Sequence, residues 1–164
     1  MLRQKIISNF LLVLASLVLI NCSGGNQSRL EKIRVNLKSE GPLYNGPNTA
    51  TGIWKPAISS GKQVKSVRFT QVKISSSDTS LNGLAANLVF QLASSNAEMK
   101  KIAFFKGKAL SNELVFQVAG EQKNLEEFFK GQEITFVVDY DLIPDEWNEN
   151  LTFTLEFDAE LITD

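Results

Sequence analysis

The chain of 164 residues contains no histidine and only one cysteine. Histidine is the commonest general base, the commonest zinc ligand and the usual charge switch near neutral pH, so these chemistries lack their ordinary residue here. One cysteine cannot form an internal disulfide or a cysteine-based zinc site. The 17 basic residues do not outnumber the 18 acidic ones. Because a basic excess is typical of proteins that bind nucleic acid, we expect no nucleic-acid partner.

A long apolar run is also missing, since no stretch reaches the ~20 apolar residues that a transmembrane helix needs. The most apolar stretch is residues 10–20, which contains a single serine. It follows the basic residues Arg3 and Lys5 and ends at small and polar residues. This order of a basic start, a short apolar run and a polar break is typical of a secretory signal peptide. Residues 1–21 are therefore predicted to be a cleaved signal.

The end of this signal, Leu19-Ile20-Asn21-Cys22, resembles a bacterial lipobox. In lipoproteins with this motif, the cysteine becomes the first residue of the mature chain and carries a thioether-linked diacylglycerol. Most lipoboxes have Gly, Ala or Ser where this chain has Asn21, a departure that resembles the relaxed lipoboxes of spirochaete lipoproteins. The resemblance covers residues 1–25 and implies that Cys22 is acylated and inserts its lipid into a bilayer. The alternative is an ordinary cleaved signal followed by an unmodified cysteine.

The remaining chain divides into a tether and one domain. Residues 22–30 are predicted to form the lipidated cysteine and a flexible tether, because glycine, serine and other polar residues predominate there. Residues 31–164 are enough for a single domain with a substantial core. Stable anchoring needs more than one acyl chain, since one short chain holds a protein only marginally. The resemblance to lipoproteins implies a lipid-anchored protein of the bacterial cell envelope, and Ser23 after the cysteine resembles the residue that sorts enteric lipoproteins to the outer membrane.

Apolar and polar residues alternate with a period of two over most of this domain, which predicts β-strands. The exception is residues 124–131, where Asn124 and Glu127 have the spacing of a capping box and predict one short helix. Turn-forming residues predict a long loop at 39–50, and a further loop is expected between the last two strands. About eight strands separated by turns favour an antiparallel β-sandwich. The predicted strands cover residues 33–38, 51–55, 63–75, 84–93, 99–106, 114–118, 134–140 and 151–159.

One of these strands changes its pattern midway. Val67 and Phe69 have one parity, whereas Val72 and Ile74 have the other. A straight strand cannot bury both pairs on the same face. Residues 63–75 are therefore predicted to contain a bulge or to change sheets.

In the number and length of its strands, the domain resembles the Ig-like sandwiches of bacterial surface proteins. No cysteine pair joins two sheets here, and the resemblance depends on no sequence motif. It implies a rigid framework that displays loops, but likeness of fold alone does not establish a function.

Acidic residues crowd the connection between the last two predicted strands. Oxygen-rich loops suit calcium, which takes six to eight oxygen ligands, although the order of residues does not fit an EF-hand. The same carboxylates could form the acid/base pair of a glycoside hydrolase, or a solvated loop that discourages strand pairing. The candidate residues are Asp139, Asp141, Asp145, Glu146 and Glu149.

Two further sets of residues are candidates for binding. Four lysines bracket the apolar segment 102–105 and could meet anionic glycans, anionic lipid headgroups or a matrix protein, or could only protect an apolar strand from aggregation. Three aromatic residues in or beside predicted loops could anchor a protein or a sugar ring, or could cap the core. These residues are Lys100, Lys101, Lys106, Lys108, Tyr44, Trp54 and Trp147.

The sequence contains no phosphate-binding loop, dinucleotide fingerprint or recognised nucleophile motif, so we name no catalytic residue. Our first hypothesis is a membrane-anchored, non-catalytic interaction module, an adhesin-like surface protein with an unidentified protein or glycan partner. The alternative is a structural or assembly lipoprotein that faces the periplasm. A glycan hydrolase is the third hypothesis.

Overall fold

The computed structural model describes residues 27–56, 63–76, 79–131 and 133–163, which form nine β-strands and one 3-10 helix. Cys22 and the predicted signal lie outside the described residues. The strands are β1 (Gln27–Ser39), β2 (Leu43–Trp54), β3 (Val64–Ser76), β4 (Ala85–Ser94), β5 (Ala97–Lys108), β6 (Glu113–Val115), β7 (Gln117–Val118), β8 (Ile134–Trp147) and β9 (Leu151–Thr163), and the helix is η2 (Leu125–Lys130).

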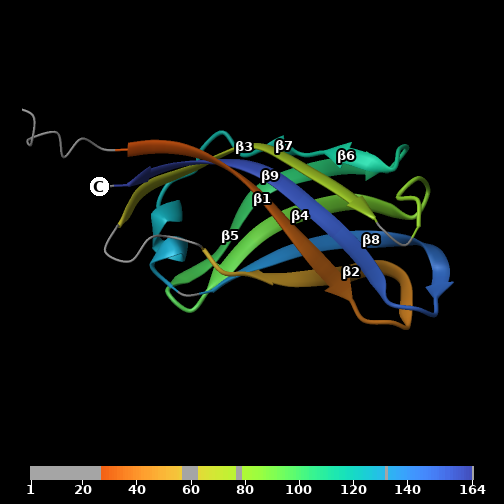
Figure 1. Cartoon of the computed structure of the whole chain (residues 1–164). Helices are drawn as coiled ribbons and strands as arrows, with labels where there is room; N and C mark the ends of the chain where they lie inside the picture. The colour runs from red at the N-terminus through yellow and green to blue at the C-terminus, as the bar shows by residue number, and fades with distance from the viewer. Residues whose placement is uncertain (1–26, 57–62, 77–78, 132, 164) are drawn as a thin grey trace, which may run out of the picture.

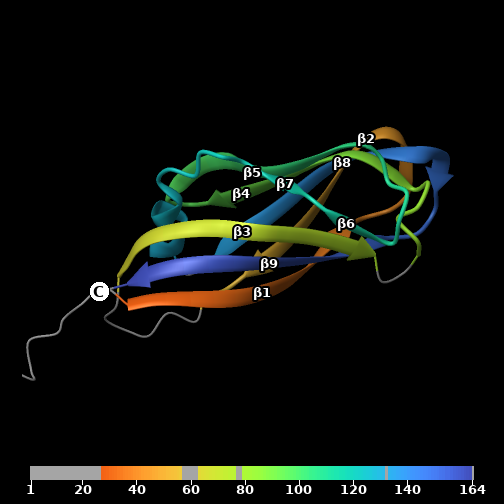
Figure 2. The ribbon, with the colours of Figure 1, turned by 90° about the horizontal axis from the view of Figure 1, so that it is seen from above.

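All nine strands belong to one antiparallel sheet with the order β6-β3-β9-β1-β2-β8-β4-β5-β7. The sheet bends until β3 and β5 approach the segment that contains β6 and β7 from opposite sides. The N–H of Phe116 donates to the Val72 carbonyl of β3 at 2.9 Å, and the N–H of Ala119 donates to the Ile102 carbonyl of β5 at 2.8 Å. The sheet is thus a nearly closed, flattened barrel in which β3, β9 and β1 face β2, β8, β4 and β5 (Figures 1 and 2).

The prediction of an all-β, antiparallel fold is confirmed. The prediction of a sandwich of two sheets is not, because hydrogen bonds link all nine strands into one sheet. Sequence periodicity reports which residues of a strand are buried, and opposing layers bury alternate residues in both architectures. Only the pairing of β1 with β2 and of the 113–119 segment with both β3 and β5 distinguishes the two.

The sheet passes from one layer to the other between β1 and β2. β1 pairs with β9 along its whole length, from Gln27↔Thr163 to Ser39↔Leu151, but the register with β2 contains only Lys38↔Thr51. Gly52 lies beside this crossing. A Cβ atom at Gly52 would overlap the carbonyl oxygen of Asn36 and would stand 2.8 Å from Cδ2 of Leu37. The two strands can approach this closely because residue 52 has no side chain.

The long loop predicted at 39–50 is wrong, because β2 begins at Leu43. Gly46, Pro47 and Asn48, which indicated a turn, lie within the strand. The register with β8 shifts between Tyr44 and Gly46, and Gly46 has a φ of +99°. A bulge accepts residues that an ordinary strand disfavours. The sequence of this bulged strand therefore resembles that of a turn.

The loop predicted between Tyr140 and Leu151 is mostly strand. β8 continues to Trp147 and β9 begins at Leu151, so the connection is residues 148–150. The extra length of β8 pairs with β2 as far as Leu43↔Trp147. The polar residues of this stretch can lie in a strand because one face of the sheet is open to solvent.

The predicted helix is present only as the 3-10 helix η2. Asn124 is in the left-handed region with a φ of 58°, and its side chain makes no capping hydrogen bond, so the predicted capping box is wrong. Leu125, Phe128 and Phe129 are buried. Six residues are too few for a helix that stands without tertiary contacts, and these three apolar side chains hold η2 against the core instead.

The predicted irregularity of the 63–75 strand is confirmed as a bulge. The register of β3 with β9 shifts between Phe69 and Gln71, so Phe69 and Val72 are both buried although their parities differ. Beside the bulge, Gln122 accepts a hydrogen bond from the N–H of Phe69 at 2.7 Å and donates one to its carbonyl at 2.8 Å. A side-chain amide thus replaces a neighbouring strand at this point of the β3 edge.

Tyr140 is a buried polar residue within the core. Its hydroxyl donates to Oγ of Ser39 at 2.9 Å, and Ser39 donates to the carbonyl of Thr49 at 2.5 Å. This chain joins β8, β1 and β2. Burial raises the pKa of Tyr140 above its ordinary value of 10.0, and the hydrogen bond with Ser39 acts in the opposite direction with a smaller effect.

We expect Tyr140 to contribute to the loss of stability at alkaline pH. Below pH 10.0 the phenol is protonated in both states, so its contribution is fully present; above this value the unfolded chain releases the proton more readily than the folded one. The free energy of unfolding, measured with denaturant, should therefore fall less steeply from about pH 9 to about pH 11 in Tyr140→Phe than in the original chain. Tyr44→Phe, at an exposed position, is the control. Equal slopes in all three proteins would contradict the prediction.

Candidate interaction surfaces

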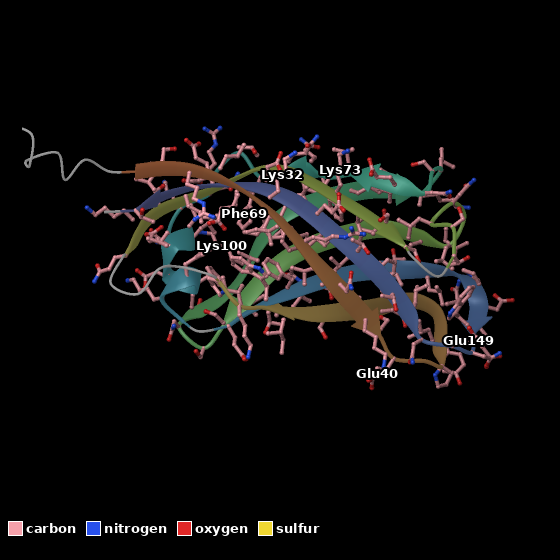
Figure 3. All side chains as sticks on the ribbon, viewed as in Figure 1. Lys32, Glu40, Phe69, Lys73, Lys100 and Glu149 are labelled. Atoms are coloured by element: carbon pink, nitrogen blue, oxygen red, sulfur yellow. The ribbon has the colours of Figure 1, made fainter. Side chains whose placement is uncertain are left out.

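The antiparallel pairing of β1 with β9 defines two ends of the molecule. Gln27 pairs with Thr163 at the near end, and Ser39 pairs with Leu151 at the far end. The connections β1–β2 and β8–β9 meet at the far end, where the N–H of Gly41 donates to Oδ1 of Asn150 at 3.1 Å. Figure 3 shows Glu40 and Glu149 at this far end and Lys100 toward the near end. A chain tethered before β1 would therefore present the far end away from its anchor.

The five predicted calcium ligands are not brought together as one loop. Asp139 and Asp141 lie within β8, Asp145 and Glu146 near its end, and Glu149 in the connection that follows. Among the residues that the structure describes, no group of three or more acidic, histidine or cysteine side chains is arranged to hold a metal ion. Calcium binding remains a prediction without a geometric site to support it.

The first two of these carboxylates take part in hydrogen bonds across the sheet. Asp139 accepts from Oγ1 of Thr49 at 2.7 Å and from Nε2 of Gln91 at 2.6 Å. Asp141 accepts from Nδ2 of Asn87 at 2.9 Å. Both groups thus link β8 to its neighbours, which is a structural use of their charge.

The three candidate aromatic residues have different environments. Trp54 packs against Phe129 and Phe136, with ring centroids 6.0 and 6.2 Å away, and Trp147 is partly buried against the core with no hydrogen-bond partner for its Nε1 in the described structure. Tyr44, in contrast, is exposed on β2 near the far end. Of the three, only Tyr44 has its ring available to a partner over most of its surface.

The four candidate lysines all lie in β5, but they do not form one group. The ammonium group of Lys100 donates to the carbonyl of Lys123 and thereby ties β5 to the segment before η2. Lys101, Lys106 and Lys108 are exposed, and the described part of the chain offers none of them an ion pair. These three lysines therefore present unpaired positive charge to solvent.

A hollow that the sequence did not predict lies on the outer surface of β1, β9 and β3. It has a volume of about 280 Å³ and is lined by polar side chains that include Lys32 and Lys73 (Figure 3). Its charges are largely matched within the protein: Arg34 pairs with Glu156 at 3.4 Å, and Lys73 pairs with Glu113 at 3.0 Å. Finding it required the register Arg34↔Glu156↔Lys73, which sequence alone does not give.

Neither a scan against protein-family models nor a search of curated proteins finds a match to this chain. Within the described residues, none of the helical structure is long and apolar enough to cross a membrane.

Proposed function

We propose that the protein is a lipid-anchored lipoprotein of the bacterial cell envelope, at the outer membrane, and that its β domain is a non-catalytic interaction module. The observation that carries this proposal is the signal-like sequence that ends at Cys22, only residues 23–26 before β1. At no more than ~3.5 Å per residue, this connection would hold the near end within roughly 20 Å of the lipid. The domain would stand next to the bilayer and not on a long stalk.

The shape of the domain supports a role in display. β1 has 13 residues, which at about 3.3 Å each span roughly 40 Å from the near end to the far end. The connections at the far end, and the exposed ring of Tyr44 near them, would face outward from the anchor. This role requires only a rigid β framework with loops at one end, which an Ig-like sandwich and a nearly closed barrel both supply.

The anchor is tested on protein isolated from its native cells. Mass spectrometry should find a mature N-terminus at Cys22 that carries the mass of a diacylglycerol and further acyl groups. Cys22→Ser should abolish this mass and leave the protein out of the membrane fraction. A precursor with an uncut signal, or an unmodified cysteine on a released protein, would contradict the proposal.

The face of the membrane is tested by adding protease to intact cells. A surface-displayed module should be degraded, whereas a structural or assembly lipoprotein that faces the periplasm should be cut only after the cells are opened. A periplasmic control protein that stays intact in the same sample verifies that the envelope is sealed. Protection of the β domain under these conditions would replace the display role by the periplasmic one.

A further inference from the structure

The outer surface of β5 carries a row of basic and aromatic side chains, which we call the β5 stripe: Lys101, Phe104, Lys106 and Lys108. All four are exposed. Across the strand pair, Lys101 lies opposite Gln91 and Phe104 lies opposite Val89 on β4. On its other side Phe104 lies opposite Gln117 of β7. The lateral neighbours of the stripe at these positions are thus uncharged.

Two bulges turn this row outward. The register of β5 with β4 shifts between Ala103 and Lys101, and Ile102 and Ala103 are both buried. Strict alternation from Ile102 would bury Phe104, but because of this bulge Phe104 faces solvent. A second shift includes Gly107, whose φ is +100°, and the N–H of Gly107 donates to Oδ1 of Asn87 at 3.0 Å. The aromatic ring therefore lies between Lys101 on one side and Lys106 on the other.

The cations of the stripe differ from most others on the described surface. Arg29, Arg34, Lys38, Lys55, Lys73, Lys123 and Lys130 each lie within 4.0 Å of a carboxylate oxygen. The only acidic residue of β5 is Glu98, at the end of the strand next to the β4–β5 turn. Without a carboxylate partner, three ammonium groups on one strand raise the local positive potential, and an anion that meets them displaces no internal ion pair.

The direction of the stripe decides between two kinds of anionic partner. From Lys101 to Lys108 the strand advances by about 3.3 Å per residue, or roughly 20 Å in total. β5 runs between the two ends of the molecule, away from the end at which β1 begins (Figures 1 and 2). A bilayer that touches the near end could meet one end of the stripe but not its whole length. A linear polymer laid along β5 could meet all four side chains.

We propose that the β5 stripe binds a linear, negatively charged polysaccharide. The three ammonium groups would contact sulfate or carboxylate groups along the polymer, and the ring of Phe104 would pack against the apolar face of a sugar ring between them. This assignment specifies the partner of the interaction module proposed above and depends on that proposal only for its biological setting, because the stripe itself lies wholly within the described domain.

The test uses the full chain in a neutral detergent, titrated with heparin as a linear sulfated polysaccharide and with uncharged dextran. Heparin should bind and dextran should not. Changing Lys101, Lys106 and Lys108 together to Gln should weaken heparin binding by about tenfold or more, and binding of the original chain should weaken with rising salt. Phe104→Ala should weaken heparin binding by a smaller factor of about threefold and leave the slope of its salt dependence unchanged.

A matched control removes the same charge elsewhere. Lys55, Lys123 and Lys130 changed together to Gln gives the same net charge at positions that already have carboxylate partners. This triple variant should lose less than about twofold in affinity. Equal losses in the two triple variants would show that only net charge matters and would overturn the proposal, as would unchanged heparin binding in the stripe variant. Thermal melting verifies folding, and Lys106→Gln alone replaces the stripe triple if the triple is unfolded.

Binding to vesicles distinguishes a polysaccharide partner from a membrane partner. The stripe triple variant should bind phosphatidylcholine vesicles, with or without phosphatidylglycerol, as the original chain does. A loss that appears only with phosphatidylglycerol, while heparin binding stays unchanged, would assign the lysines to lipid headgroups and overturn the proposal. None of these binding measurements depends on where the protein lies in the cell. They can therefore contradict the β5 stripe while the lipid anchor is confirmed, or support the stripe while the anchor is contradicted.

Discussion

Gly52→Ala should lower the free energy of unfolding by about 3 kcal/mol, the upper part of the range for overpacking. A methyl group there would overlap the carbonyl oxygen of Asn36, which is backbone and cannot rotate away. Relief would require β1 and β2 to separate at the place where the sheet passes from one layer to the other. Urea unfolding of the purified full chain, followed by circular dichroism, measures the change.

Gly120→Ala is the matched control for this substitution. A Cβ atom at Gly120 would meet no atom within 4 Å, and the residue is exposed. Its stability should stay within about 0.5 kcal/mol of the original chain. If Gly52→Ala were as stable as Gly120→Ala, the close crossing of β1 and β2 would be incorrect.

The strands that sequence periodicity predicted best are those with one buried and one solvent-facing side. Ile33, Val35 and Leu37 of β1, and the alternate residues of β9 from Leu151 to Leu161, are buried as the alternation requires. A shift of one residue would expose the whole apolar set, so the pattern strongly constrains the strand. What the pattern does not contain is the partner of each strand, and the single nearly closed sheet therefore had to be seen in the structure.

The first part of β2, residues 43–50, and the end of β8 were missed for one common reason. Each carries turn-forming or acidic residues that ordinary strands disfavour, and each is stabilised by pairing with the other, from Leu43↔Trp147 to Trp54↔Ile134. The bulge at Tyr44/Gly46 and the hydrogen bond between Thr49 and Asp139 both involve residues at least 90 positions apart along the chain. No local window of sequence contains both partners.

The candidate binding residues show the same limit. Charge along the sequence identified the lysines of β5, but it placed Lys100 with the others although its ammonium group is used within the protein. Phe104 was grouped with the apolar segment 102–105, because the bulge that turns it outward depends on the register with β4. The sequence identified the lysines as candidates, but the spacing and direction of the β5 stripe could not be predicted from it.

The core contains an aromatic cluster that joins the two layers. Phe69 of β3 and Phe157 of β9 come from one layer, and Phe90 of β4 and Phe136 of β8 from the other. The ring centroid of Phe136 is 5.8 Å from that of Phe90 and 5.1 Å from that of Phe157. Trp54 adds a fifth aromatic ring to this cluster, with its centroid 6.2 Å from that of Phe136. Phe136 thus contacts aromatic side chains from both layers.

Phe136→Ala should lower the free energy of unfolding by about 3–5 kcal/mol, because it removes a fully buried ring and leaves a cavity between layers that the continuous sheet holds apart. Urea unfolding measures the loss, and Phe104→Ala is the control, since Phe104 is 37% exposed and its truncation should cost less, about 1–2 kcal/mol. If both variants lost the same stability, the two layers would not share one aromatic core. A folded Phe104→Ala protein also makes its heparin affinity interpretable, so this control serves both experiments.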